Sequence, residues 1–238
     1  MLSTNVLFGV QSVYMKEDGL TGMYYDYAMA APLMVPDKEP EDLDVLILGM
    51  GTGTYATQCR KYFGDMSIEG VEIDGKITEL SRKYFSLQMS SVEFFSMVKE
   101  HLTENGVMVV NMNMRGQGEG NINQYLSDTI ASVFGNVYTA DVRGTTNREL
   151  FASDNDAMLE VLKSNTAGLT NGDLRNLMTA VADQSQRYEA GEYLMTDDKA
   201  PVELLGMQVI DQLIQDEVAY YKEIYRRDGL QGLISQLG

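Results

Sequence analysis

Residues 44–74, DVLILGMGTGTYATQCRKYFGDMSIEGVEID, decide the fold of this chain. The apolar run Val45–Leu48 predicts a buried parallel strand, and Ile68–Asp74 predicts a second strand with carboxylates at its end. A helix-compatible segment between them opens after three alternating glycines: Gly49, Gly51 and Gly53. Strand, glycine turn, helix and strand in this order form a βαβ unit, so we expect an α/β fold of the Rossmann-like type.

The glycine turn predicts a nucleoside site. Glycines let the backbone approach a ligand closely, and the first N–H groups of the helix are free to bind it. Glu72 stands 23 residues after Gly49, where a carboxylate can accept hydrogen bonds from both ribose hydroxyls. Thr54 replaces the third glycine of a dinucleotide fingerprint, so the spacing favours S-adenosylmethionine over NAD. A tight turn without a ligand is the alternative.

The net charge of the chain limits the classes of binding partner that we expect. The chain has 238 residues, with 35 acidic against 18 basic side chains, a net charge of −17 and a pI near 4.3. Such a field repels phosphate backbones, so we expect no nucleic-acid partner. It attracts cations, and polyamines are small polycations.

The cysteine and histidine content limits which cellular compartment and which cofactors we expect. A single cysteine, Cys59, excludes an internal disulfide framework and fits a reducing, cytoplasmic setting; we expect it to pack in a helix. One cysteine and one solvated histidine, His101, predict no metal site. No apolar run approaches the length of a membrane span and no signal peptide is visible, so we expect no membrane contact.

The motif GMGTGT followed by GVEID resembles the spermidine synthase family of aminopropyltransferases. Two downstream stretches are similar to its bacterial spermidine synthase-like branch, which often occurs fused to membrane segments. The resemblance covers about Gly9 to Glu203. Further matching stretches are GVQSVY at 9–14, GMYYDY at 22–27, QMSSVEFF at 88–95 and LMTDDKAP at 194–201.

The resemblance implies a co-substrate and a site. The co-substrate would be decarboxylated S-adenosylmethionine, or S-adenosylmethionine itself, and the acceptor a polyamine such as putrescine. A homodimer is one assembly state that we expect. The residues implied for the nucleoside are Gln11, Gly49, Gly51, Gly53 and Glu72, and those for the substrate are Tyr24, Tyr25 and Asp26. For the N-terminal group, an aromatic cluster that packs a small sheet is the alternative.

Three departures from the family pattern leave the catalytic residue unknown. About forty residues, enough for a strand–helix–strand unit, are missing between Leu87 and Gln88, and they would include the catalytic aspartate. Thr52 stands where the glycine loop usually carries an aspartate. The aromatic residue expected near the closing strands is not evident in residues 144–147. An S-adenosylmethionine-dependent methyltransferase and a non-catalytic binding protein are therefore the alternatives to an active aminopropyltransferase.

We expect three parts in the chain: an N-terminal β segment at 1–36, a reduced, methyltransferase-type Rossmann-like domain at 37–154, and a C-terminal helical extension at 155–238. Thr196, Asp197 and Asp198 precede Pro201 either as helix caps or as substrate-side acids.

The missing segment makes a prediction about the sheet. The strand at 45–48 loses its inner neighbour, and its backbone groups need a partner. The simplest repair places it directly beside the strand at 107–112, followed by a closing antiparallel pair at 137–142 and 148–153. Helices are expected at 91–102 and 121–134, where apolar residues recur at helical spacing.

Overall fold

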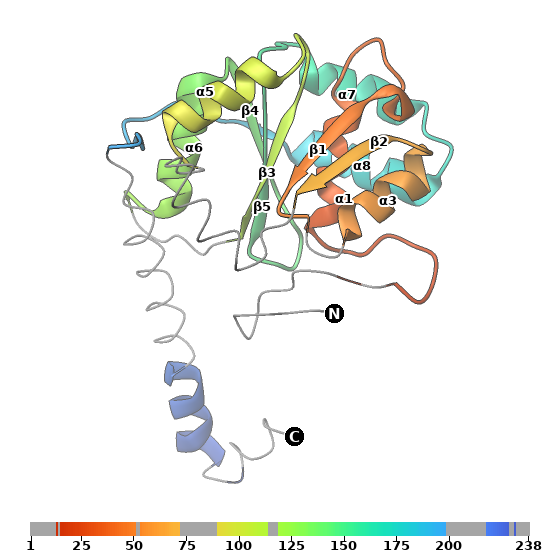
Figure 1. Cartoon of the computed structure of the whole chain (residues 1–238). Coiled ribbons are helices and arrows are strands. Elements are labelled where there is room, and N and C mark those ends of the chain that lie inside the picture. Colours follow the sequence, from red (N-terminus) through yellow and green to blue (C-terminus); the bar gives the residue numbers. More distant parts are fainter. Residues whose placement is uncertain are drawn as a thin grey trace.

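The structure is a computed structural model that describes residues 13, 15–50, 53–71, 90–113, 119–198, 218–228 and 231. Its described part is a mixed α/β fold in which two sheets are packed among helices (Figure 1). The predicted α/β class is therefore confirmed.

The predicted βαβ unit is present. Strand β1 (Asp44–Leu48) leads through the glycine turn into helix α3 (Thr54–Phe63), which returns the chain to strand β2 (Ser67–Val71). The two strands pair in parallel, with Val45 opposite Ile68. A helix that connects two parallel strands is the Rossmann-like unit expected from residues 44–74.

The second sheet has four strands in the order β3-β5-β4-β6, and all its pairs are antiparallel. The closing pair is confirmed, and it follows the strand expected at 107–112. The two-residue strand at the β4 edge is an addition that the sequence did not predict. The four strands are β3 (Met108–Asn113), β4 (Asn136–Asp141), β5 (Asn147–Ser153) and β6 (Gln186–Arg187).

The predicted repair of the sheet is wrong. Among the described residues, β1 pairs only with β2, and β3 pairs only with β5, so β1 and β3 belong to different sheets. Joining them would require their edges to come within hydrogen-bonding distance, about 4.8 Å between strands. Instead, helix α1 (Tyr24–Ala28) packs against both α3 and β3 and occupies the space beside them.

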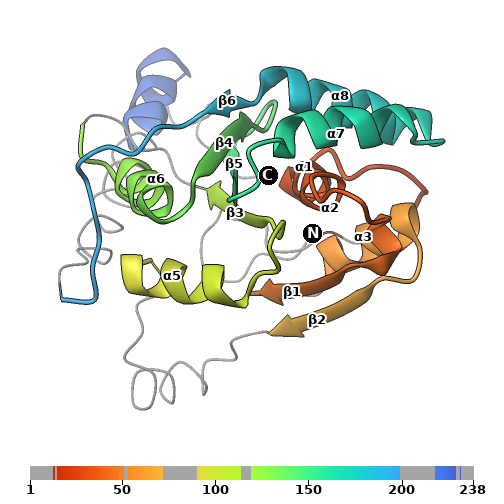
Figure 2. The same cartoon turned by 90° about the horizontal axis from the view of Figure 1, so that it is seen from above.

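Helices cover both faces of the four-stranded sheet (Figure 2). On one face, Phe95 of α5 and Ile130 of α6 form a core with Leu150. On the other face, Phe151 packs in a second core with Met29, Leu162 and other residues of the remaining helices. The helices concerned are α5 (Val92–His101), α6 (Ile122–Val133), α2 (Ala30–Leu33), α7 (Met158–Ala167) and α8 (Gly172–Gln184).

The N-terminal part differs from expectation where it is described. Residues 24–33 form α1 and α2, not a strand, followed by a short 3-10 helix, Pro40–Asp42. The strands expected at 3–15 lie almost wholly outside the described residues. The second core draws on residues from all three predicted parts of the chain, and the division at 36 and 154 stays a prediction.

Strand β1 is not the buried strand that its apolar run predicts. Leu46 and Leu48 are 61% and 52% exposed, while Val45 is only partly exposed and packs against the second core. The Val45 face packs against the second core, which also contains Cys59 and Phe63 of α3, whereas Leu46 and Leu48 are exposed on the opposite face. A run of apolar residues reports a buried strand only when both faces are covered.

Candidate functional site

The glycine turn lies at the carboxyl end of β1. Gly49 and Gly53 both have positive φ, 79° and 85°, a region that side chains other than glycine rarely adopt. Backbone hydrogen bonds hold the turn: the N–H of Gly49 donates to Val71 O at 2.8 Å, and that of Gly53 donates to Met50 O at 3.1 Å. Gly51 and Glu72 lie outside the described residues. The turn therefore opens α3 at the edge of the sheet where Rossmann-like folds bind ligands.

Thr54, the first residue of α3, ties the N-terminal segment to this turn. Its side chain is nearly buried, and its hydroxyl oxygen accepts a hydrogen bond from the N–H of Val13 at 3.0 Å. The same hydroxyl lies 3.3 Å from Val13 O, to which it can donate. Gln11, predicted to bind the nucleoside, lies two residues before Val13 and outside the described residues.

Tyr24, Tyr25 and Asp26 all lie on α1. Asp26 is fully buried, its Oδ2 accepts a hydrogen bond from the N–H of Gly22 at 2.7 Å, and burial raises its pKa. The rings of Tyr24 and Tyr25 are 3.9 Å apart. Asp26 thus stabilises the loop that precedes α1. A role for these three residues in binding a substrate stays a prediction.

Helix α1 stands beside the helix of the glycine turn. The two helices are in contact, and Tyr55 Oη lies 3.4 Å from Ala28 O, within reach for donating a hydrogen bond. Tyr55 also approaches Cys59, whose buried thiol has a pKa raised to about 12 by burial. The described residues of the two predicted groups, the glycine turn and the Tyr-Tyr-Asp segment, are therefore brought together.

Glu149 is the residue of this region that the sequence analysis missed. It lies on β5, its side chain is fully buried, and neither carboxylate oxygen has a hydrogen-bond partner among the described residues. Burial raises its pKa to about 8. Helix α1 contacts β5. Burial raises the pKa of Tyr24 and Tyr55, and the charge of Glu149 adds a smaller rise, so the carboxyl lies within electrostatic range of both α1 and α3. The feature of the sequence that could have identified Glu149 is an acidic residue within an apolar strand, next to Leu150 and Phe151.

Asp197 has a structural setting. Ser91 caps α5 by accepting a hydrogen bond from the N–H of Phe94, and its hydroxyl donates to Asp197 Oδ1 at 2.5 Å. The N–H of Asp197 in turn donates to Glu93 Oε2 at 3.1 Å. These bonds dock the chain after β6 on the start of α5, which favours the structural alternative for this residue. Pro201 and the start of the predicted helix lie outside the described residues, which are helical again at 218–228.

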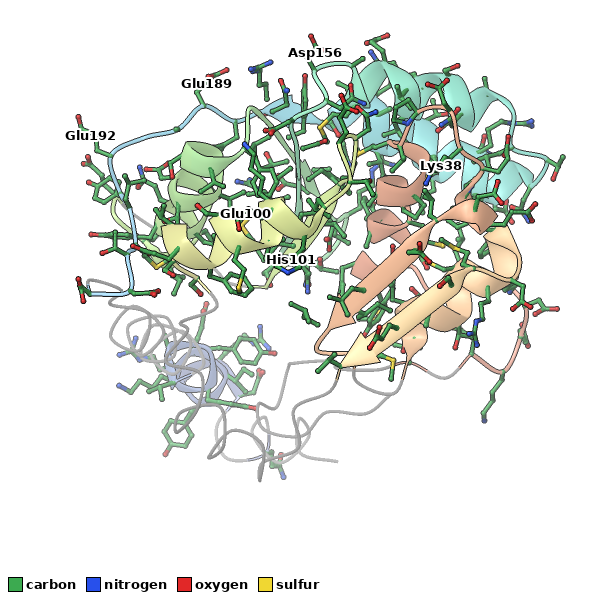
Figure 3. All side chains as sticks on the ribbon, turned by 45° about the horizontal axis from the view of Figure 1, so that its top comes forward. Lys38, Glu100, His101, Asp156, Glu189 and Glu192 are labelled. Atoms are coloured by element: carbon green, nitrogen blue, oxygen red, sulfur yellow. The ribbon has the colours of Figure 1, made fainter. Side chains whose placement is uncertain are left out.

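The described surface is strongly acidic. Figure 3 shows the side chains of Asp156, Glu189 and Glu192 pointing outward from the body, and all three are exposed. His101 is exposed at the end of α5, as predicted for a solvated histidine. Among the described residues, no helix is both long enough and apolar enough to span a membrane.

Comparison with known proteins gives one strong likeness in sequence. No protein-family model matches the chain. It is 46% identical, over 288 residues that cover 98% of this chain, to a Bifidobacterium longum (strain NCC 2705) protein named "Probable polyamine aminopropyl transferase". The chain is similar to an aminopropyl transferase. It spans 64% of the length of that relative, and the 288 matched residues exceed the 238 of this chain.

A solved structure gives a weaker likeness. The crystal structure of human methyltransferase-like protein 13 in complex with SAH aligns with a TM-score of 0.46 and 15% identity, covering 70% of this chain and 95% of the other.

Proposed function

We propose that the chain belongs to the spermidine synthase family and transfers an aminopropyl group from decarboxylated S-adenosylmethionine to a polyamine such as putrescine. The observation that carries the proposal is the 46% identity, over 98% of this chain, to a protein named as a polyamine aminopropyl transferase. The glycine turn and its neighbour α1 support it from the structure. We propose the cytoplasm as the compartment.

The chemistry asks little of the protein beyond positioning. A neutral amine attacks the methylene carbon beside a sulfonium, the carbon–sulfur bond breaks, and methylthioadenosine leaves. The protein must align the two reactants, bind the charged end of the polyamine and accept a proton. The turn at Gly49 and Gly53 opens α3, whose first-turn N–H groups have no partner within the helix and can bind the nucleoside, and α1 packs beside it.

We propose weak turnover for the chain. The segment that bears the catalytic aspartate in the family has no counterpart between Leu87 and Gln88. A match of 288 residues to a chain of 238 supports a gap on this side of the alignment. Nucleoside binding, which uses the glycine turn, should survive a loss that removes the proton acceptor.

Separate incubations test the activity. The chain is incubated with putrescine and either decarboxylated or ordinary S-adenosylmethionine, and the sulfur-containing product is identified by mass spectrometry. Slow release of methylthioadenosine is the expected result. S-adenosylhomocysteine would indicate a methyltransferase, and no product from either donor would indicate a binding protein.

Glu72 provides a test of the nucleoside site. Glu72→Gln should weaken methylthioadenosine binding about tenfold, because a hydrogen bond to a charged group contributes about 1.5–3 kcal/mol. Glu69→Gln, on the exposed side of β2, is the matched control and should leave the affinity unchanged. Titration calorimetry measures both, and equal affinities for the wild type and Glu72→Gln would remove Glu72 from the site.

A further inference from the structure

A buried, unpartnered carboxyl lies under the helix that carries the predicted substrate residues. Glu149 occupies the strand between β3 and β4, with Asn111 and Ala140 as its register neighbours. Its exposed fraction is 0%, and both carboxylate oxygens lack a hydrogen-bond partner among the described residues. A carboxyl in such a place either stays neutral or receives a cation, because a bare buried charge is too costly.

The groups around Glu149 suit a cation of the ammonium type. Asn111 accepts a hydrogen bond from the Asn147 amide at 2.8 Å on the same face of the sheet. Helix α1, which carries Tyr24, contacts β5, and the phenol groups of Tyr24 and of Tyr55 on α3 lie within electrostatic range of Glu149. These amide and phenol oxygens can accept hydrogen bonds from N–H groups. Among the described residues, no lysine or arginine forms an ion pair with Glu149.

The burial of β5 decreases from Glu149 toward Asn147, which pairs with the carboxyl end of β3. Asn147 is only partly buried and precedes Glu149 on the same face of β5, and Asn111, also partly buried, lies directly opposite Glu149 on β3. A linear polyamine is a narrow chain of methylenes that carries ammonium groups. Because the carboxyl is fully buried, the amine can reach it only when the residues that cover it move aside.

We propose that Glu149 is the specificity-determining carboxylate that binds an ammonium group of the acceptor polyamine. This inference rests on the proposed function, since it names the anchor for the acceptor in that same site. Glu149 would also provide an acidic side chain, from β5, in a chain that lacks the family's usual acidic segment.

Binding of this kind moves a proton. With a pKa of about 8, the Glu149 carboxyl is mostly protonated at pH 7. An ammonium group favours the carboxylate, so the carboxyl proton leaves to solvent as the amine enters. Up to about one proton should therefore be released for each polyamine bound at pH 7. A carboxyl with only a structural role would release none.

Calorimetric titration of putrescine into the whole chain, saturated with methylthioadenosine, tests the inference. Titrations in two buffers of different ionisation enthalpy give the number of protons released. Glu149→Gln should weaken putrescine binding at least tenfold and abolish proton release, with methylthioadenosine affinity unchanged. Glu149→Asp keeps the charge and should retain part of both effects, and Glu189→Gln, an exposed acid, is the matched control.

The two proposals fail in different ways. Unchanged putrescine affinity and proton release in Glu149→Gln would overturn the role of Glu149, as would a wild-type chain that binds methylthioadenosine but no putrescine. A wild-type chain that fails to bind methylthioadenosine would overturn the proposed function. Circular dichroism and thermal melting of each variant exclude unfolding as the cause of a lost affinity.

Discussion

At the scale of single residues, Glu149 should make stability depend on pH. Its pKa rises from an ordinary value of 4.5 to about 8 on folding, so between these values the folded chain holds a proton that the unfolded chain releases. The contribution of Glu149 to stability therefore falls as pH rises from 4.5 to 8 and is constant outside this window. At about 1.4 kcal/mol for each pKa unit, the loss is about 5 kcal/mol.

Denaturation by urea at several pH values between 5 and 8 measures this effect. Glu149→Gln should flatten the profile, because an amide has no proton to lose, and should stabilise the chain at pH 8. Glu160→Gln, an exposed acid on α7, should leave the slope unchanged. If the free energy of unfolding of the wild type changed with pH at the same rate as that of Glu149→Gln, the result would contradict the raised pKa of Glu149.

Single residues were predictable where they belong to a motif or where their residue type favours one setting, as with the buried Cys59 and the exposed His101. Gly49 and Gly53 lie in the predicted turn, and both adopt a positive φ, which few other residues do. Glu149 carries no such signal. It shares a face of β5 with Phe151, while Arg148 shares the other with Leu150, so alternation does not tell which acid is buried.

At the scale of elements, the segment after β6 depends on Asp128 of α6. This buried carboxylate accepts a hydrogen bond from the Tyr188 phenol at 2.6 Å and another from the N–H of Tyr193 at 3.1 Å. The N–H of Met195 then donates to Thr129 on the same helix. Residues 188–195 are thus held along α6 by side chains that the helix itself provides.

We expect the pair formed by Asp128 and Tyr188 to contribute about 1.5–3 kcal/mol, as hydrogen bonds to charged groups do. Asp128→Asn, Tyr188→Phe and the double variant form a mutant cycle, and urea denaturation measures the coupling between them. Tyr125→Phe, on the same helix, serves as a control. Strict additivity of the two substitutions would show that the bond contributes nothing.

Elements with a regular apolar pattern were predicted well, and the others were not. The helices α5 and α6 and the pair β4 and β5 follow their expected ranges within a few residues, because local periodicity determines them. The aromatic run that forms α1 has no clear period. The partner of β1 is a contact distant in sequence, which local pattern cannot supply.

At the scale of the whole molecule, the open face of the β1-β2 sheet should promote self-association. Leu46, Leu48 and Val71 are exposed side by side, since Leu48 and Val71 are register partners. Contiguous apolar surface of this kind associates with other apolar surface. The double substitution Leu46→Thr and Leu48→Thr should reduce association while changing stability little, because both side chains are already more than half exposed.

Sedimentation velocity over a range of protein concentrations measures this. Val45→Thr, on the covered face of the same strand, is the contrasting variant and should lower stability without reducing association. Identical sedimentation of the wild type and the double variant would show that this face takes no part in self-association.

Cys59 gives the molecule a built-in reporter. It is the only thiol in the chain, it is fully buried on α3 as a member of the second core, and burial raises its pKa to about 12. A thiolate reagent can label it only while α3 and α1 are apart. The labelling rate of Cys59 therefore measures how often the region proposed to admit the polyamine opens. Slower labelling with ligand present would show that the ligand keeps this region closed for longer.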